Sequence, residues 1–267
     1  MLPTYVRDDV FTGVSKKVAG SREHFFHFLI GYLLPIVHSQ RRYQYGTFLV
    51  LDCGPLMTPI LRETLNRLNF SFQIVPPRAI ETPVYVEPWD HPSPEGWPST
   101  STQALRSAAD LVSAAWRVHT CEQPDCPRSA NLLIQRSAAH EYYVSGAAEI
   151  KGYGLSRRGV INWSEVQVAL KDRGIDHAVY EPGRHSLGCQ IAAFRHARRI
   201  VGMRGAEWAN TVWCHAGARA RILDPAPPAT LLTSLLHRMG VHHEFAVVNE
   251  RLAREDPGAV AGFLTTP

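Results

Sequence analysis

The sequence predicts an α/β fold, in which parallel β-sheets are covered by helices. Short apolar runs rich in β-branched residues alternate along the 267 residues with stretches whose apolar residues recur at helical spacing. Such alternation is typical of strand–helix–strand units, in which the helix returns the chain so that the two strands run parallel. Residues 200–210, IVGMRGAEWAN, show the pattern most clearly, because Ile200 and Val201 lead through a glycine-bearing turn into a new helical register.

In the first half of the chain the predicted elements are a helix over 23–39, a strand over 47–51, a helix over 58–68, a strand over 70–75, a short apolar run over 84–86 and a helix over 102–119. Turn residues follow both longer strands, Asp52-Cys53-Gly54-Pro55 in one case and Pro76-Pro77 in the other. Residues 88–101 are rich in Pro, Ser and Trp and are predicted to form a loop.

Residues 121–129, which contain Pro124 and Pro127, are predicted to link two domains, 1–122 and 123–267. Beyond this linker the predicted elements are a strand over 131–135, a helix over 162–173, a strand over 178–180, a helix over 187–196, a strand over 199–202, a helix over 207–215 and a strand over 220–223. The polar stretch from Asn249 onward is expected to fray.

Composition and charge narrow the function classes. A hydrophobic content of 45% with 19% charged residues is that of a globular protein, and no apolar stretch is long enough to span a membrane. The net charge is +4, and the basic residues form scattered local groups. They do not form a basic stripe with aromatic residues between them, so small anionic ligands are favoured over nucleic acid. Five scattered cysteines and the lack of a signal peptide predict a cytoplasmic location without a disulfide framework.

The turn after Val201 carries the strongest functional signal. Gly202 and Gly205 allow a tight turn and a close backbone approach, and the backbone N–H groups that begin the next helix point at any anion bound there. The spacing is neither GxGxxG nor a P-loop, so a purely structural turn remains an alternative. A Rossmann oxidoreductase is disfavoured, because the GxGxxG segment and its following acidic residue are both missing. Cys121, Cys126 and His119 lack a second ligand pair, so no metal site is predicted.

Several segments around this turn share an order with a known family. They are Asn131-Leu132-Leu133-Ile134-Gln135-Arg136, Arg158 to Glu165, Glu181, Ser186-Leu187, Gln190-Ile191, Ala197, Gly217, Arg221 to Pro225, and the aromatic helix His24-Phe25-Phe26-His27-Phe28-Leu29 in the first half. In that order the chain resembles glycosyltransferase family 61, which includes plant xylan-decorating, animal GlcNAc and bacterial capsule transferases. The resemblance spans residues 23–225.

The resemblance implies a GT-B architecture, in which two Rossmann-like lobes flank a cleft. The second lobe would bind the donor and the first lobe the acceptor. It further implies an inverting transfer from a nucleotide sugar, most simply a UDP-sugar, to a hydroxyl group of a glycan or glycoconjugate. No cofactor is expected, and no Asp-x-Asp segment that could hold a cation is present.

The chain departs from the family pattern at the turn itself. Arg204 stands where the family has a loop histidine, Glu207 stands where it has a glycine, and Gln135-Arg136 replaces its Ser-Arg. Arginine can hold a diphosphate bidentately, but it cannot act as a general base. A non-catalytic α/β module that binds a sugar or nucleotide therefore remains the alternative, with Arg204 and Glu207 marking lost activity.

The donor-binding candidates are the residues that follow strands or form the turn: Arg136, Arg158, Gly202, Arg204, Gly205, Ala206, Glu207, Asn210 and Asp224. Each has a structural alternative. Arg136 and Arg158 could be solvated surface charges. Asn210 could pin the loop by hydrogen bonds, and Asp224 could shape the turn before proline. Asn162, followed three residues later by Glu165, is interpreted mainly as a helix capping box.

Two residues in the first domain are candidates for the catalytic base. His27 matches the histidine of the family's aromatic helix, and imidazole titrates near neutral pH, as a base that activates a hydroxyl group should. Asp52 follows a strand at the edge where α/β sheets bind ligands, although it could simply cap a turn. His24, one helical turn before His27, is a third possibility.

Overall fold

The computed structural model describes residues 4–7, 22–39, 47–76, 102–116, 126–138, 140–145, 158–225, 230–248 and 252–266. The run 84–86, the loop before residue 102, and His119 with Cys121 lie outside the described residues. The chain divides into two compact units. Unit 1 comprises Met1–Arg117 and Ala148–Ile150, and unit 2 comprises Val118–Ala147 and Lys151–Pro267. Both units contain parallel sheets and helices, so the predicted α/β class is confirmed.

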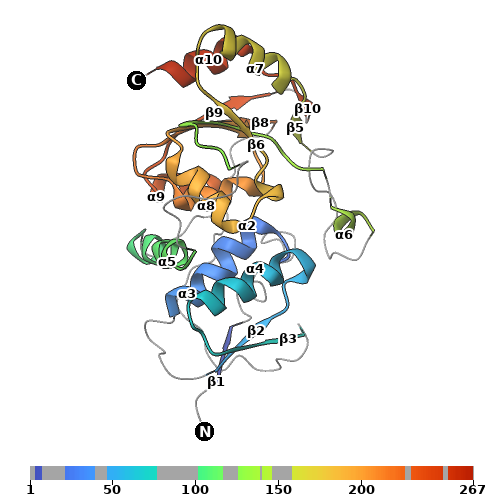
Figure 1. Ribbon diagram of the computed structural model, residues 1–267, viewed down its shortest axis with the longest axis vertical. Helices are drawn as coiled ribbons and strands as arrows, with labels where there is room; N and C mark the ends of the chain where they lie inside the picture. The colour runs from blue at the N-terminus through green and yellow to red at the C-terminus, as the bar shows by residue number, and fades with distance from the viewer. Residues whose placement is uncertain are drawn as a thin grey trace. The chain divides into compact units, whose positions relative to one another are not determined.

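Unit 1 is a small parallel sheet with helices. Its elements are β1 (Thr4–Arg7), α2 (Phe25–Phe28), η1 (Leu29–Leu33), α3 (Leu34–Ser39), β2 (Thr47–Leu51), α4 (Gly54–Arg67), β3 (Phe72–Val75) and α5 (Thr102–Ala115). The three strands lie in the order β1-β2-β3 and run parallel (Figure 1). The α2–η1–α3 segment supplies most of the fully buried side chains of this unit, including Tyr32, whose hydroxyl accepts a hydrogen bond from Leu51 N–H.

The predicted helix over 23–39 is interrupted by one π-helical turn. Leu34 N–H donates to the Leu29 carbonyl, five residues back, immediately before Pro35. Pro35 has no N–H, and its ring would clash with the carbonyl four residues earlier in a regular α-helix. The wider π turn relieves that clash, so the helix continues to Ser39 instead of breaking.

Unit 2 contains the larger sheet. Its elements are β4 (Asn131–Ile134), α6 (Glu141–Val144), β5 (Gly159–Val160), α7 (Trp163–Asp172), β6 (Ala178–Tyr180), η2 (Pro182–Arg184), α8 (Leu187–His196), β7 (Arg199–Met203), η3 (Ala206–Trp213), β8 (Arg219–Asp224), α9 (Thr230–Arg238), β9 (His242–Val247), β10 (Leu252–Ala253) and α10 (Pro257–Thr265). Five strands pair in parallel in the order β6-β4-β7-β8-β9, and β5 pairs in parallel with β10.

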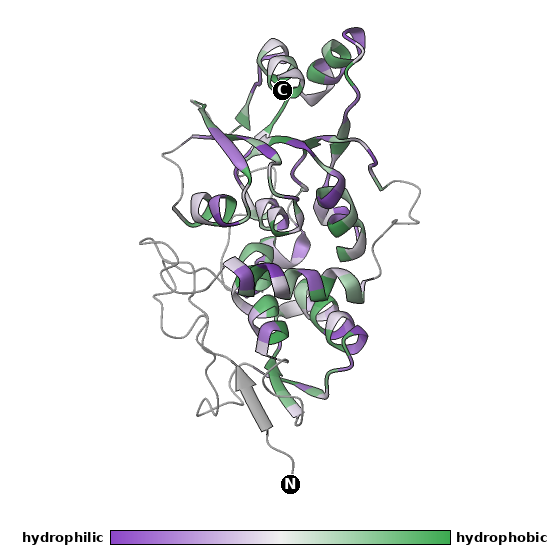
Figure 2. Ribbon diagram, turned by 90° about the vertical axis from the view of Figure 1, so that its left-hand side faces the viewer, coloured by the Kyte–Doolittle hydropathy of each residue, from purple (hydrophilic) through white to green (hydrophobic). Residues whose placement is uncertain are grey.

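Helices cover both faces of the five-stranded sheet (Figure 1). On one face α7 and α10 pack together with the β5–β10 pair, and their side chains form a continuous core with Leu133, Val201 and Leu223 of the sheet. On the other face lie α8, α9 and η3. The helices are part hydrophobic and part hydrophilic, as expected of elements that bury one side (Figure 2). The central strands β4 and β7 are buried on both faces, which explains their unbroken apolar sequences.

The prediction that the chain frays from Asn249 onward is wrong. Residues 252–266 form β10 and α10, and Val260, Phe263 and Leu264 are buried against α7. Asp256 caps α10, because its carboxylate accepts hydrogen bonds from the N–H groups of Gly258 and Ala259. An N-cap aspartate before a proline at the first helical position is a recognisable start signal, which the prediction, based on the polar residues that precede it, did not use.

Candidate functional site

The strand order of unit 2 places a switch point between β4 and β7. From β4 the chain passes to β6 on one side, whereas from β7 it passes to β8 on the other side. In doubly wound sheets the connections diverge at such a point and leave a crevice at the carboxyl ends of the strands, where ligands bind. The carboxyl ends of β4 and β7 lead directly into Arg136 and into residues 204–207. Several donor-binding candidates therefore meet at one edge of the sheet.

Arg136 and Glu207 form an ion pair at this point. Arg136 Nε lies 3.2 Å from Glu207 Oε1, and the two side chains are only 9% and 15% exposed. Gly205 packs against both side chains. A Cβ atom at position 205 would lie 2.8 Å from Arg136 Nε and would collide with Glu207 Oε2. The glycine is therefore required by the space that the ion pair occupies.

Arg204 and Asp224 form a second ion pair at the ends of β7 and β8. Arg204 Nε lies 2.9 Å from Asp224 Oδ2, and the Arg204 N–H donates to the Leu223 carbonyl. Asp224 is 1% exposed and Arg204 is 17% exposed. A carboxylate at such depth is tolerated because a cation lies beside it. Both arginines expected to hold a diphosphate thus have carboxylate partners within the chain.

Asn210 pins the loop. Its side chain is fully buried. Its amide nitrogen donates to Gln190 Oε1 at 2.9 Å and to the Glu207 carbonyl at 3.1 Å, and its amide oxygen accepts from Trp213 Nε1. Gln190 lies on α8, so the hydrogen bonds join the loop to that helix. This contact joins two of the sequence segments on which the family resemblance rests, Gln190-Ile191 and residues 202–210. Ala206 is the first residue of η3, which is a 3₁₀-helix.

Gly202 lies inside β7, where the neighbouring strand needs the space. A Cβ atom there would lie 2.8 Å from Ile134 Cβ and 3.3 Å from the Ile134 carbonyl oxygen.

We expect Gly202→Ala to lower the free energy of unfolding by about 1–3 kcal/mol, the range for overpacked cores, as measured by urea denaturation. Gly262→Ala is the matched control. A Cβ atom at Gly262, in α10, would meet nothing within 4 Å, so this change should not destabilise the protein. Equal effects of the two changes would contradict the steric explanation.

Asn162 does not cap its helix through its side chain, in contrast to the capping-box prediction. Its amide instead brackets the backbone of Glu255, accepting from Glu255 N–H at 2.9 Å and donating to the Glu255 carbonyl at 3.0 Å. Glu165 forms an ion pair with Arg254, the residue before Glu255. This segment therefore holds the chain that leads into α10. Arg158 meets the switch point through its carbonyl oxygen, 3.5 Å from Arg136 Nη1.

The two candidate bases lie in unit 1. His27 is partly buried on α2, just before the π turn, with ring contacts to Phe26 and His24. Asp52 is exposed after β2, and its Oδ1 accepts from Gly54 N–H at 2.8 Å and from the Thr58 hydroxyl at 2.6 Å. These bonds start α4 four residues earlier than predicted. Arg22 Nε donates to the Asp52 carbonyl, which places the segment before α2 along the end of β2.

Thiol and metal chemistry gain little support from the described residues. Burial raises the pKa of the Cys53 and Cys214 thiols, so neither is a nucleophile near neutral pH. In the part of the chain that the structure describes, no three His, Cys, Asp or Glu side chains gather as metal ligands do. Nor does that part contain a helix long and apolar enough to cross a membrane.

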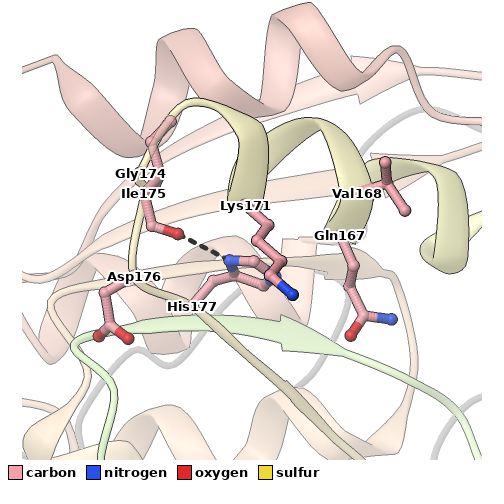
Figure 3. A pocket seen from close by; sticks show the side chains of 7 residues that line it. All are labelled: Gln167, Val168, Lys171, Gly174, Ile175, Asp176 and His177. Carbon is pink, nitrogen blue, oxygen red and sulfur yellow. Dashed lines mark hydrogen bonds between the residues drawn. The ribbon is translucent and has the colours of Figure 1, made fainter.

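A surface hollow lies beside α7 and the turn before β6 (Figure 3). It has a volume of about 420 Å³ and is lined by Gln167, Val168, Lys171, Gly174, Ile175, Asp176 and His177. His177 is held by a hydrogen bond between its Nδ1 and the Ile175 carbonyl. These residues belong to α7 and to the turn that enters β6, so the hollow adjoins the amino end of a strand. Ligand sites of open parallel sheets form at the carboxyl ends of the strands, so the hollow is not part of the candidate site.

Comparison with known proteins supports the family indicated by the sequence segments. A search of curated proteins gave no match. The family model described as Glycosyltransferase 61 matches residues 25–221, which is most of the chain and includes α2, β2, β4, α7, α8, β7 and η3. Members of such a family transfer a sugar from a donor to an acceptor. The chain belongs to glycosyltransferase family 61.

Proposed function

We propose that this protein is an inverting glycosyltransferase of GT-B architecture, which moves a sugar from a UDP-sugar to a hydroxyl group of a glycan or glycoconjugate. Family membership supplies the general activity. One observation supports a specific donor site: Arg136 lies beside residues 204–207 at the β4–β7 switch point. Two arginines and the first N–H groups of η3 at one crevice suit a diphosphate.

In the proposed mechanism the donor diphosphate binds at this crevice. Arg136, Arg204 and Arg158 neutralise its charge, and the backbone N–H groups of Gly205 and Ala206 donate hydrogen bonds to its oxygens. The same groups stabilise the leaving UDP as its bond to the sugar breaks. Guanidinium groups supply the positive charge, so no metal ion takes part.

A base from unit 1 activates the acceptor. His27 removes the proton of the acceptor hydroxyl group, whose oxygen then attacks the anomeric carbon on the face opposite the leaving diphosphate. Attack from that side inverts the anomeric configuration. Arg204 cannot take over this role, because guanidinium does not lose its proton in proteins. The mechanism requires unit 1 to carry the acceptor and unit 2 the donor.

A non-catalytic module that binds a sugar or nucleotide is the second candidate. It is favoured by one observation, namely that Glu207 and Asp224 neutralise the two arginines at the crevice. Such a protein would bind the nucleotide sugar and release no product. The two candidates therefore differ in turnover, and they share the binding step.

Release of free nucleotide from a panel of nucleotide sugars, with a mixture of glycan acceptors, separates the two candidates. We expect at least one UDP-sugar to be consumed, and the rate to persist in EDTA because arginines replace a metal. The product is then analysed by NMR for its anomeric configuration. Binding without turnover across the panel supports the non-catalytic module. Loss of activity on chelation, restored by manganese, contradicts the metal-free mechanism.

A further inference from the structure

Two of the arginines at the switch point, Arg136 and Arg204, are each balanced by an acid. In the described residues Arg136 faces Glu207 and Arg204 faces Asp224, so the two ion pairs carry no net charge. We propose that Glu207 acts as a built-in competitor, whose carboxylate occupies the side of Arg136 that an incoming phosphate must take. Glu207 thereby lowers the affinity of the site for phosphate groups. The inference rests on the proposed function only in identifying the phosphate as that of a sugar-nucleotide donor.

The ion pair between Arg136 and Glu207 is weak. It consists of one contact through Arg136 Nε, and its 3.2 Å separation exceeds the roughly 2.7–2.9 Å of strong charge-assisted bonds. The second oxygen, Glu207 Oε2, is buried and accepts no hydrogen bond from any described residue. By comparison, Arg254 contacts both oxygens of Glu165. An incompletely satisfied carboxylate is easier to displace than a bidentate partner, because less is lost when it leaves.

The backbone around Glu207 stays in place when the side chain leaves. The Glu207 carbonyl is held by Asn210, which is itself bonded to Gln190 on α8. Gly205, two residues before, carries no side chain that could block the movement of the carboxylate. At 15% exposure the Glu207 side chain already reaches solvent. The carboxylate can therefore swing outward without any change in the loop that would receive the phosphate.

Removing the charge of Glu207 should expose Arg136 to an anion. The Arg136 side chain is 9% exposed, so the surrounding water screens its charge poorly. For an effective dielectric constant between about 80, as in bulk water, and about 20, as near a protein surface, one fewer negative charge about 5 Å from a bound phosphate corresponds to a gain in affinity of roughly fourfold to a few hundredfold. Glutamine keeps the size of the side chain and an oxygen that accepts from Arg136 Nε, so this substitution changes little except the charge.

The test is calorimetric titration of the full chain with inorganic pyrophosphate. We expect Glu207→Gln to bind pyrophosphate about tenfold more tightly than the unaltered protein. Glu244→Gln is the matched control, because it removes one carboxylate paired with an arginine, Arg221, in the same unit and away from the switch point. It should leave the affinity unchanged. Adding Arg136→Met to Glu207→Gln should abolish the gain.

Unchanged affinity in Glu207→Gln, or no measurable binding by either protein, would overturn the proposal. Weaker binding would also overturn it and would show that Glu207 positions Arg136 for its ligand. Pyrophosphate contains no sugar, so a gain in affinity stands even if no sugar nucleotide is consumed. Conversely, turnover of a UDP-sugar with equal affinities in the two proteins rejects the competitor and retains the transferase. Urea denaturation of each variant confirms that it is folded.

Discussion

Substitution of His27 by alanine is expected to lower turnover by about a hundredfold or more while leaving donor affinity nearly unchanged. Loss of a general base slows the chemical step and does not touch the proposed donor site, which lies in unit 2. Asparagine or glutamine at this position should fail as badly, because neither side chain can take up the proton. Initial rates at saturating donor, together with calorimetric donor affinity, measure the two effects separately.

His24→Ala is the matched control for this prediction. It removes the neighbouring imidazole, whose ring centre lies 6.1 Å from that of His27, and should have only a mild effect. Thermal unfolding of both variants separates catalysis from packing, since a His27→Ala protein that unfolds would assign His27 to the core. Unchanged turnover in His27→Ala, combined with abolished turnover in Asp52→Asn, would make Asp52 the base.

Arg204→Ala is expected to destabilise the protein by about 3–5 kcal/mol, the range for a buried ion pair that loses one partner. The change leaves the carboxylate of Asp224, 1% exposed, without its cation. Arg204→Ala combined with Asp224→Asn should recover much of the loss, because the second change removes the buried negative charge that Arg204 neutralised. Urea denaturation of the single and double variants gives the free energies of unfolding.

Arg254→Ala serves as the control for Arg204→Ala. Arg254 pairs with Glu165 at the surface, both side chains being more than half exposed, and such pairs contribute about 0–1 kcal/mol. Equal stability of the two variants would show that Asp224 is satisfied by other groups. In the folded fraction of Arg204→Ala, nucleotide-sugar affinity should also fall by about 1.5–3 kcal/mol if Arg204 binds the diphosphate. Unchanged affinity would remove Arg204 from the donor site and leave it a structural residue.

The elements of unit 2 were the easiest to predict. The helix over 187–196 agrees with the structure at both ends, because Ser186 gives a clear N-cap: its hydroxyl accepts from Cys189 N–H. The strands over 131–135 and 199–202 differ by one residue, since they are continuous apolar runs bounded by polar residues. Periodicity and capping are local, and local patterns can be read along a chain.

The site was predicted residue by residue and not as a set of contacts. Arg136 and Glu207 are 71 residues apart, and nothing in either segment indicates that they meet. Their contact follows from the strand order, which brings β4 beside β7 although β5 and β6 come between them in the chain. The role of Asn162 was missed for the same reason, because its partner Glu255 is 93 residues away.

The two hydrogen bonds between Asn162 and Glu255 hold the segment before α7 to the segment before α10, and this pairing has a consequence for biosynthesis. Strand β5 and helix α7 cannot bury Val160, Trp163 and Val166 fully until β10 and α10 have been made and have docked. At a synthesis rate of about 5–20 residues per second, this apolar surface is exposed for several seconds on the nascent chain. Such a surface is a binding site for chaperones. Chains interrupted before residue 252 should therefore be retained by them, whereas chains that extend through α10 should be released.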